Sequence, residues 1–247
     1  MSSRAYTYVD RTVVRLGNRW IERTWSAFIG NSTNLHHKMA DTELLEGRSR
    51  EFALLVDGEW RGVMDFAEIE WSEENSPLGA ALICRQRGDG LDVVIRTTAF
   101  HDNPGMVRQV SVANLGEGTV DLGPACSEAL TLDPDKTTIW ASGFEAAVTS
   151  QEYKSPDHAV ALEVNGSEIL FGQIGGGQFH LFAQEPGECA VFVDEQAALA
   201  GGQTWHMPPT LLLPYTEGRD SAFTRLLGEF LLKCRELKRL HDRPRDS

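Results

Sequence analysis

Two tryptophans stand in polar stretches, where an aromatic ring could contact a ligand. Trp71 lies in the stretch EWSEEN, and Trp140 lies in the stretch TTIWAS. Both stretches look loop-like in composition. Sugars stack their C–H faces on Trp or Tyr rings, while nearby amides and carboxylates bind the hydroxyl groups. We therefore select Trp71 and Trp140 as carbohydrate-binding candidates, weighed against ordinary packing of each ring in the core.

A second pair of aromatic residues lies in an extended, proline-rich segment, GGQTWHMPPTLLLPYTEG, at residues 201–218. Trp205 precedes two prolines, and Tyr215 follows a third. Prolines suit a strand at the edge of a sheet, because a missing N–H there costs no ladder hydrogen bond. We expect this segment to be the last edge strand of the fold, with Trp205 and Tyr215 covering the edge as further carbohydrate-binding candidates.

Acid–base chemistry on a sugar ring requires a different set of residues. It needs a carboxylate and a histidine whose pKa values lie near neutrality. His101 lies beside a predicted strand, and Glu145 or Glu185 could act as the base. These three residues are the catalytic candidates if the chain is a sugar 1-epimerase. The alternative for each histidine is a half-buried side chain that is hydrogen-bonded within the fold.

Other catalytic and metal sites are not favoured by the spacing of residues. No GxSxG motif is present, and the glycines at 172–177 precede no Lys-Ser/Thr pair, so they predict a hairpin turn and not a phosphate loop. His36, His37, Asp41 and Glu43 lack a spacing that would bring them together on a metal. The four cysteines are scattered without a CxxC pair, which favours reduced structural thiols. We expect neither a metal nor a cofactor.

Composition narrows the classes of partner. The 247-residue chain has a formal net charge of −13, which disfavours binding to nucleic acid and to anionic membranes. No apolar run approaches the ~20 residues of a membrane span, and the N-terminus lacks the apolar core of a signal peptide. The expected location is cytoplasmic.

The elements that position these residues are predicted to be mostly β-strands. Three hairpins are clearest: residues 12–16 with 19–25 around Gly17-Asn18, residues 51–56 with 59–66 around Asp57-Gly58, and residues 80–87 with 91–100 around 88–90. No amphipathic helix intervenes, so the pattern is typical of antiparallel sheets stacked as a sandwich, in one domain over residues 1–219. Further strands are predicted at 106–113, 119–122, 145–150, 159–164, 167–173, 178–183 and 189–194.

One strong helix is predicted, at the C-terminus. From Asp220 or Ser221 as the N-cap, apolar residues recur at spacings of three and four and form one face. Cations crowd the last turns, where they suit the helix dipole, and Pro244 ends the helix. We expect residues 220–247 to pack on the sandwich or to lead out of it.

Several stretches together resemble the N-terminal β-supersandwich of alpha-galactosidase-type glycoside hydrolases, the melibiase clan. The stretch VVRLGNRWIER at 13–23 is similar to the hairpin that opens those domains, and residues 90–95, 101–104 and 107–114 are similar to their middle. The segment 201–218, followed by a helix, is similar to their end. The resemblance covers nearly the whole chain and implies an all-β, two-sheet antiparallel supersandwich of the galactose mutarotase-like kind, with a C-terminal amphipathic helix.

The resemblance also implies what the chain does. In those hydrolases the catalytic carboxylates belong to a barrel that follows the sandwich, where this sequence ends at Ser247, so no residue here inherits their role. We therefore expect a non-catalytic domain that binds a sugar or oligosaccharide or supports a glycoside hydrolase, with a catalytic barrel or a second copy as possible partners. The same fold houses sugar 1-epimerases, which keep that alternative open, although their histidine pattern is absent around Asn114-Leu115.

Overall fold

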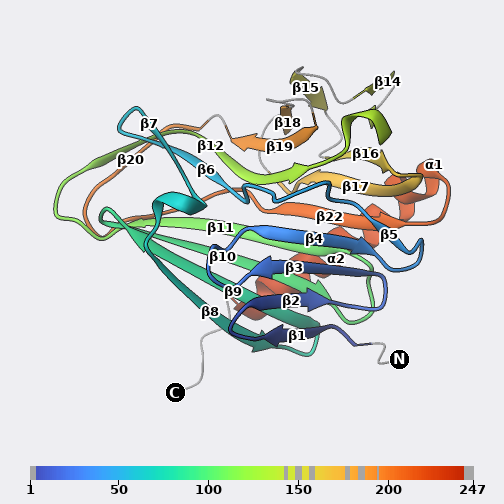
Figure 1. Cartoon of the computed structure of the whole chain (residues 1–247), viewed down its shortest axis with the longest axis horizontal. Helices are drawn as coiled ribbons and strands as arrows, with labels where there is room; N and C mark the ends of the chain where they lie inside the picture. Colours follow the sequence, from blue (N-terminus) through green and yellow to red (C-terminus); the bar gives the residue numbers. More distant parts are fainter. Residues whose placement is uncertain are drawn as a thin grey trace.

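The computed structural model describes residues 4–141, 144–147, 152–155, 159–175, 179–182, 187–193 and 195–241. Over these residues the chain forms three antiparallel sheets and a C-terminal helical segment (Figure 1). The ten-stranded sheet forms one layer, and the five-stranded and seven-stranded sheets face it together. The predicted all-β supersandwich with a C-terminal helix is confirmed. No helix in the described part of the chain is long and apolar enough to cross a membrane.

The five-stranded sheet is a simple meander, in which each strand pairs with the next along the chain. Its central hairpin is the one predicted around Gly17-Asn18. The Asn18 carboxamide oxygen accepts from the backbone N–H groups of Trp20 and Ile21 at 2.9 and 3.0 Å, which fixes the turn. The strands are β1 (Tyr6–Val9), β2 (Val13–Gly17), β3 (Ile21–Ser26), β4 (Ser32–His37) and β5 (Thr42–Glu43).

The ten-stranded sheet contains two strands of ten residues each, joined by the predicted hairpin around Asp89-Gly90. Both turn residues have positive φ, 49° and 77°, as a two-residue hairpin turn requires. The strands are β8 (Glu68–Asn75), β9 (Gly79–Gly88), β10 (Leu91–Phe100), β11 (Met106–Asn114), β13 (Thr137–Ala141), β14 (Phe144–Ala147), β16 (Ala159–Val164), β17 (Ser167–Gln173), β21 (Thr204–His206) and β22 (Thr210–Tyr215).

The seven-stranded sheet is built around the long strand β12 (Val120–Thr131), which pairs with strands from both halves of the chain. The predicted hairpin around Asp57-Gly58 supplies its edge, again with positive φ at both turn residues. The other strands are β6 (Ala53–Val56), β7 (Glu59–Gly62), β15 (Glu152–Ser155), β18 (Phe179–Phe182), β19 (Glu188–Val193) and β20 (Ala197–Leu199).

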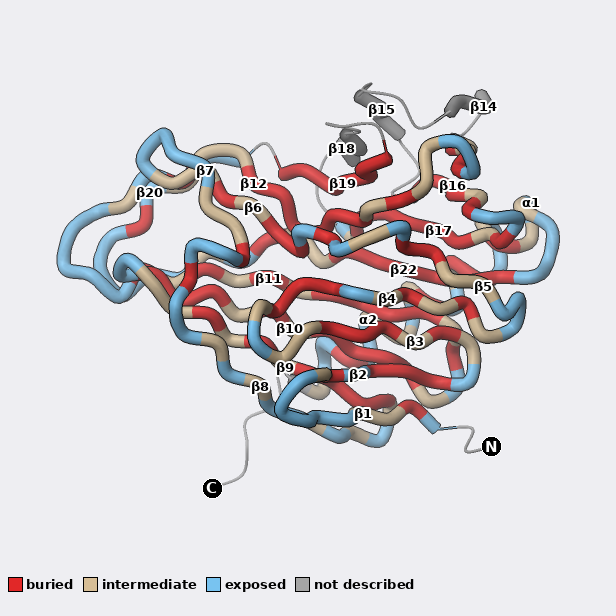
Figure 2. The backbone as a smooth tube through the Cα atoms, viewed as in Figure 1, coloured by how far each residue is buried: buried red, intermediate tan, exposed pale blue. Residues whose placement is uncertain are grey.

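Two apolar clusters fill the space between the layers, where the buried residues run through the middle of the molecule (Figure 2). The first joins the five-stranded sheet to the ten-stranded sheet, for example through Leu16, Trp25 and Phe171. The second joins the seven-stranded sheet to β9, β10 and β11, for example through Leu54 and Val93. Alternate residues of strands such as β9 and β11 point into the interior between the layers, as the period of two predicts.

A buried group of four charged side chains holds the three sheets together. Arg23 on β3, Arg108 on β11 and Glu128 on β12 meet Glu51, which precedes β6, and their side chains are at most 2% exposed. Arg23 lies 3.0 Å from Glu51 and 2.6 Å from Glu128. Arg108 pairs with the Glu51 carboxylate, and with Glu128 at 3.4 Å. Two positive and two negative charges therefore neutralise one another within the core; we call these four residues the buried quartet.

Neutral groups complete the hydrogen bonding of the buried quartet. The Trp25 indole N–H donates to Glu51 at 3.1 Å, and the Ser32 backbone N–H donates to the same carboxylate at 2.7 Å. The Thr210 hydroxyl donates to Glu128 at 3.2 Å. Burial alone would raise the pKa of Glu51, but the charges of Arg23 and Arg108 outweigh it and lower the pKa to about 2.

The C-terminal helical segment covers the outer face of the ten-stranded sheet. It runs through α1 (Arg219–Ser221), a π-helical turn η3 (Ala222–Leu226) and α2 (Leu227–His241). Phe230 packs edge-on against Phe100 with ring centroids 5.6 Å apart. A Cβ at Gly105 would lie 2.2 Å from the Phe230 ring, so only glycine allows this close approach.

The start of this helix corrects the sequence prediction. The N-cap is Gly218 and not Asp220 or Ser221. The Ser221 hydroxyl donates to Glu217 at 2.8 Å and caps no backbone N–H of the helix. Sequence reasoning selected a good capping side chain, but here the chain enters the helix two or three residues earlier.

The proline-rich segment also differs from its prediction. Strand β22 is not the edge of the sheet, because it lies between β17 and β11. Its pairing with β11 stops at Leu212, so one side of β22 has no neighbouring strand at Pro214. Proline is tolerated because this part of a central strand is locally an edge.

Candidate functional site

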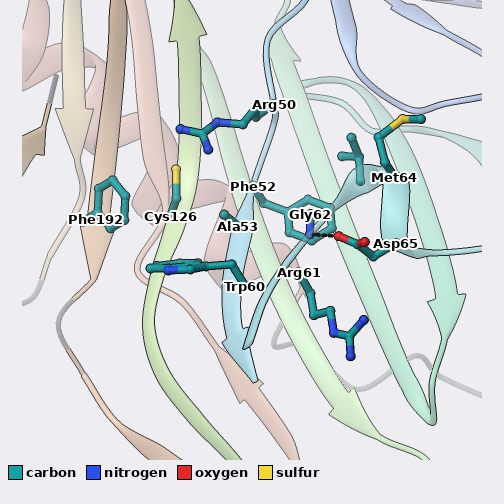
Figure 3. Close-up of a pocket in the computed structure, with 11 residues that line it drawn as sticks. Arg50, Phe52, Ala53, Trp60, Arg61, Gly62, Met64, Asp65, Cys126 and Phe192 are labelled. Carbon is teal, nitrogen blue, oxygen red and sulfur yellow. Dashed lines mark hydrogen bonds between the residues drawn. The ribbon is translucent and has the colours of Figure 1, made fainter. Parts of the chain in front are cut away.

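A groove of about 390 Å³ opens on the outer face of the seven-stranded sheet, and we call it the Trp60 groove (Figure 3). Its residues come from β6 and the segment just before it, from β7, β12 and β19, and from the short 3₁₀ turn η1 (Val63–Asp65). Ala53, Cys126 and Phe192 belong to a small apolar cluster on this face, whereas Phe52 and Val63 also belong to the second interior cluster. The groove is lined by Arg50, Phe52, Ala53, Trp60, Arg61, Gly62, Val63, Met64, Asp65, Cys126 and Phe192.

The hairpin turn at Asp57-Gly58 places Trp60 on this face. Trp60 pairs with Leu55 across the hairpin and lies in register with the outward side of β6. Trp60 is 51% exposed and is the most exposed tryptophan in the described part of the chain. The Phe192 ring meets it edge-on, with centroids 6.3 Å apart and planes at 88°. This contact fixes the orientation of an indole whose other surface stays open.

The floor of the groove is apolar. Phe52, Cys126 and Phe192 are buried, and Ala53 packs against the last two. Burial, together with the nearby charge of Glu188, raises the pKa of the Cys126 thiol to about 12. The thiol therefore stays protonated at neutral pH and contributes apolar surface, not a nucleophile.

One charged pair faces the apolar floor. The Arg50 guanidinium lies on the side of the floor opposite Trp60 (Figure 3). It donates to the Glu188 carboxylate through Nε at 2.9 Å and through Nη2. The Arg50 side chain is 50% exposed and that of Glu188 is 9% exposed. Glu188 thus neutralises and orients a guanidinium whose side chain is half exposed.

The rim of the groove is formed where β7 ends. The Asp65 carboxylate accepts from the Gly62 backbone N–H at 2.6 Å and holds the η1 turn in place. Met64 on this turn is 74% exposed. The Arg61 side chain extends away from Arg50 (Figure 3) and bonds to Glu59 at 2.8 Å. The rim therefore offers a flexible apolar side chain and few free charges.

This arrangement suits binding more than catalysis. An exposed indole, an apolar floor and an oriented guanidinium match a ligand with one apolar face and several hydroxyl groups. Among the described residues that line the groove, Asp65 is the one carboxylate, and it is occupied by a backbone N–H. A pair of carboxylates, as glycoside hydrolysis requires, is not found in this lining.

The predicted carbohydrate-binding residue Trp71 lies elsewhere. Its stretch is not a loop but strand β8, at the edge of the ten-stranded sheet. The indole N–H donates to the Ala27 carbonyl at 3.1 Å, and the ring lies 6.0 Å from that of Trp25. Trp71 is half-buried and packs against both interior clusters.

The other three predicted aromatic residues are also separate from the groove and from one another. Trp140 lies on strand β13, not in a loop, and the Arg219 guanidinium stacks on it at 3.7 Å. Trp205 on β21 packs against the second interior cluster. Tyr215, at the end of β22, is buried under the C-terminal helix. The structure does not bring the four predicted residues together.

The acid–base candidates are placed only in part. Both ring nitrogens of His101 contact the backbone: Nδ1 accepts from the Ala5 N–H at 3.0 Å, and Nε2 lies 3.2 Å from the Ser76 carbonyl. These contacts fit a neutral ring that ties the N-terminus to the sheet. Glu145 lies on β14, opposite Trp140, but its side chain is outside the described residues, as is the whole of Glu185.

The histidines and acids near residue 40 serve local structure. His37 is buried and its Nε2 lies 3.4 Å from the Tyr215 carbonyl. The Glu43 carboxylate accepts from the Leu35 and Leu45 backbone N–H groups at 2.7 and 3.0 Å. In the described part of the chain, no group of three or more His, Cys, Asp or Glu side chains is arranged to hold a metal.

Sequence reasoning missed Trp60, although a signal was present. Trp60 stands between Glu59 and Arg61, directly after the Asp57-Gly58 turn. On a short strand after a tight turn, an aromatic residue between two charges lies at a sheet edge, where one face is open. The pattern could have placed Trp60 among the candidates, but it could not have shown that β12 and β19 complete a groove beside it.

Comparisons with known proteins establish the fold. No family model matches the sequence, and no curated protein matches it. Among solved structures, the chain is similar to the GH36 alpha-galactosidase AgaB from Geobacillus stearothermophilus, with a TM-score of 0.63 and 11% identity over 86% of this chain. It is also similar to the galactosidase domain of the alpha-galactosidase-sucrose kinase AgaSK, with a TM-score of 0.66 and 11% identity over 86% of this chain.

A further similarity is to a galactose mutarotase related enzyme from Lactobacillus acidophilus, with a TM-score of 0.52 and 8% identity over 87% of this chain and 98% of that chain. By contrast, this chain spans 41% of AgaB and 42% of AgaSK. The fold is therefore the galactose mutarotase-like supersandwich, which the sequence resemblance predicted. At these identities, the similarity concerns the fold alone.

Proposed function

We propose that this chain is a non-catalytic carbohydrate-binding domain and that the Trp60 groove holds the sugar. The observation that carries the proposal is the half-exposed Trp60 indole, held by Phe192 beside an apolar floor and facing Arg50. The sugar's C–H face would stack on the indole, and its hydroxyl groups would accept from the guanidinium.

The charge of the groove favours a neutral sugar. Glu188 already balances the positive charge of Arg50, so an acidic sugar would find no unpaired cation there. A GH36 alpha-galactosidase of this fold, AgaA from Geobacillus stearothermophilus, has been solved with raffinose. We therefore choose neutral galactosides, melibiose and raffinose, as the first ligands to test.

A supporting role beside a catalytic domain is the second candidate. Its basis is the size of the alpha-galactosidase chains, of which this fold makes up about two fifths. A domain with this role alone would bind no free sugar, so the two candidates differ in a simple assay.

The test is proton NMR of galactose, glucose, melibiose and raffinose with the wild-type protein. Saturation transfer and the rate of exchange between anomers are read in the same samples. We expect transfer from protein to sugar without faster exchange. Accelerated exchange would contradict the non-catalytic proposal and favour a sugar 1-epimerase, and the absence of both signals would favour the supporting role.

A further inference from the structure

A second groove, of about 300 Å³, lies on the opposite layer of the molecule, between the last turns of α2 and the outer face of the ten-stranded sheet. Most of its lining is apolar. Leu231, Cys234 and Leu237 come from the helix, while Val107, Ile174 and Pro209 come from β11 and from the segments that flank β17 and β22. None of these residues lines the Trp60 groove, so the second groove is independent of the proposed sugar site.

The shape of the second groove favours a narrow, extended occupant. Its helical lining runs from Leu231 to Lys238, seven residues further on, which at 1.5 Å per residue spans about 10 Å. A partner helix is itself about 10–12 Å wide, and a stable protein interface buries on the order of 1,000 Å² or more. A single alkyl chain fits a slot of this size better than a folded partner does.

Two cationic side chains lie along one side of the second groove. Arg235 and Lys238 both line it, and both are exposed. Neither has an ion-pair partner in the described part of the chain. Elsewhere on the same helical segment, Arg225 pairs with Glu217 and Glu229, and Lys233 pairs with Asp102 at 2.9 Å.

Arg11 and Arg48 are also exposed without an ion pair among the described residues, but only Arg235 and Lys238 of these four lie beside the apolar walls of the second groove. The chain carries 36 acidic residues against 23 Lys and Arg, so carboxylates are plentiful. Cations near a helix C-terminus gain some stability from the helix dipole. The dipole acts equally on Arg239, which does not line the groove, so it does not explain why Arg235 and Lys238 lie beside the groove. Apolar walls beside two unpaired cations complement a ligand that has an alkyl chain and one negative charge.

We propose that the second groove binds a medium-chain fatty acid, with the alkyl chain along Leu231, Cys234 and Leu237 and the carboxylate at Arg235 and Lys238. The Gln109 carboxamide, which also lines the groove, adds a hydrogen-bond donor for the same carboxylate. A neutral alcohol of equal length buries the same chain but lacks the charge. A cationic amphiphile meets repulsion at the rim.

Cys234 provides a reporter at the site. It is the one cysteine of the four that is not fully buried. Burial raises the pKa of its thiol to about 12, so alkylation is slow, and any further shielding by a bound chain is measurable. Alkylation by N-ethylmaleimide is followed by mass spectrometry at pH 8. Octanoate, decanoate and decyltrimethylammonium are used below their micelle concentrations, and decanol is used below its solubility limit.

We expect decanoate to slow alkylation of Cys234 about tenfold and saturably. Its affinity should exceed that of octanoate by about fourfold per added methylene group. The double variant Arg235→Gln/Lys238→Gln should bind decanoate at least about fivefold more weakly, with binding of decanol unchanged. The matched control Arg239→Gln should behave as the wild type, and circular dichroism confirms that each variant is folded.

Three outcomes would overturn the proposal. Equal protection by all three decyl amphiphiles would show that charge plays no part. Unslowed alkylation with decanoate would show that the groove is not occupied. Protection that rises with protein concentration, without any amphiphile, would identify a second copy of the chain as the occupant.

Discussion

Two of the arginine–glutamate groups in the protein differ in their surroundings, and the surroundings decide what each can do. In the buried quartet, Arg23 and Arg108 meet Glu51 and Glu128 with side chains at most 2% exposed. In the Trp60 groove, Arg50 meets Glu188 with half of the guanidinium side chain exposed. The first set joins three sheets, whereas the second lies on the outer face of one sheet.

The difference shows how a similar pairing serves folding in one place and recognition in the other. In the interior, every charge must be paired, because an unpaired charge there is very unfavourable. At the groove, half of the Arg50 side chain is exposed, so a ligand that enters the groove can contact it. Disrupting the buried quartet should therefore change stability, and disrupting the groove should change affinity.

The largest expected effect comes from removing one member of the buried quartet. Arg108→Met leaves Glu51 and Glu128 with one cation between them, and we expect it to lower the free energy of unfolding by about 3–5 kcal/mol. Urea denaturation measures the change. The double variant Arg108→Met/Glu128→Gln restores the charge balance and should lose less stability than Arg108→Met alone. A loss equal to the sum of the losses in Arg108→Met and Glu128→Gln would contradict the pairing.

Acid should reduce the stability that the buried quartet contributes. The folded pKa of Glu51 is about 2, against an ordinary value of 4.5. Because the pKa is lowered on folding, the stability from this group is fully present above pH 4.5 and is lost as the pH falls toward 2. The urea concentration at the unfolding midpoint, measured from pH 6 to pH 2, should decrease between pH 4.5 and pH 2. In Glu51→Gln, if it folds, stability should decrease less steeply with acid. An unchanged pH profile would contradict the claim that protonation of Glu51 causes the decrease.

A smaller loss of stability is expected at Trp71. Its half-buried ring packs against both interior clusters, and its N–H donates to Ala27. Trp71→Ala should lower the free energy of unfolding by roughly 2–3 kcal/mol, because a cavity replaces the ring. Sugar affinity of the folded variant should stay the same. A selective loss of affinity would return Trp71 to the binding residues predicted from the sequence.

The smallest effect belongs to the charged side of the groove. Arg50→Ala should weaken sugar binding by about fivefold, which corresponds to one charge-assisted hydrogen bond with a partly hydrated donor. Titration calorimetry measures it, with Arg87→Ala as the matched control, since Arg87 pairs with Glu70 on the ten-stranded sheet and does not line the groove. Equal losses in both variants would indicate a general charge effect.

Much of the fold followed from local patterns. The hairpins at Asp57-Gly58 and Asp89-Gly90 are encoded by turn residues that tolerate positive φ, and the helix is encoded by apolar spacing. The placement of β22 was wrong, because strand order depends on pairings between distant segments that proline content does not report.

The candidate site was less accessible to sequence reasoning. The Trp60 groove combines strands from residue 53 to residue 193, and no local pattern joins them. The buried quartet was missed for a related reason: Arg23 and Glu128 look like ordinary surface charges in sequence, and burial becomes visible only when three sheets meet. Aromatic composition found Trp71 but could not show that its N–H is occupied by Ala27.

The most direct test of the central claim is the affinity of Trp60→Ala for the sugar that gives the strongest saturation transfer. Trp60 is half-exposed and joins no two sheets, so the free energy of unfolding should change by less than about 1 kcal/mol. We predict at least a tenfold loss of affinity by titration calorimetry. Unchanged affinity in a folded Trp60→Ala protein would contradict the claim that this groove is the carbohydrate site.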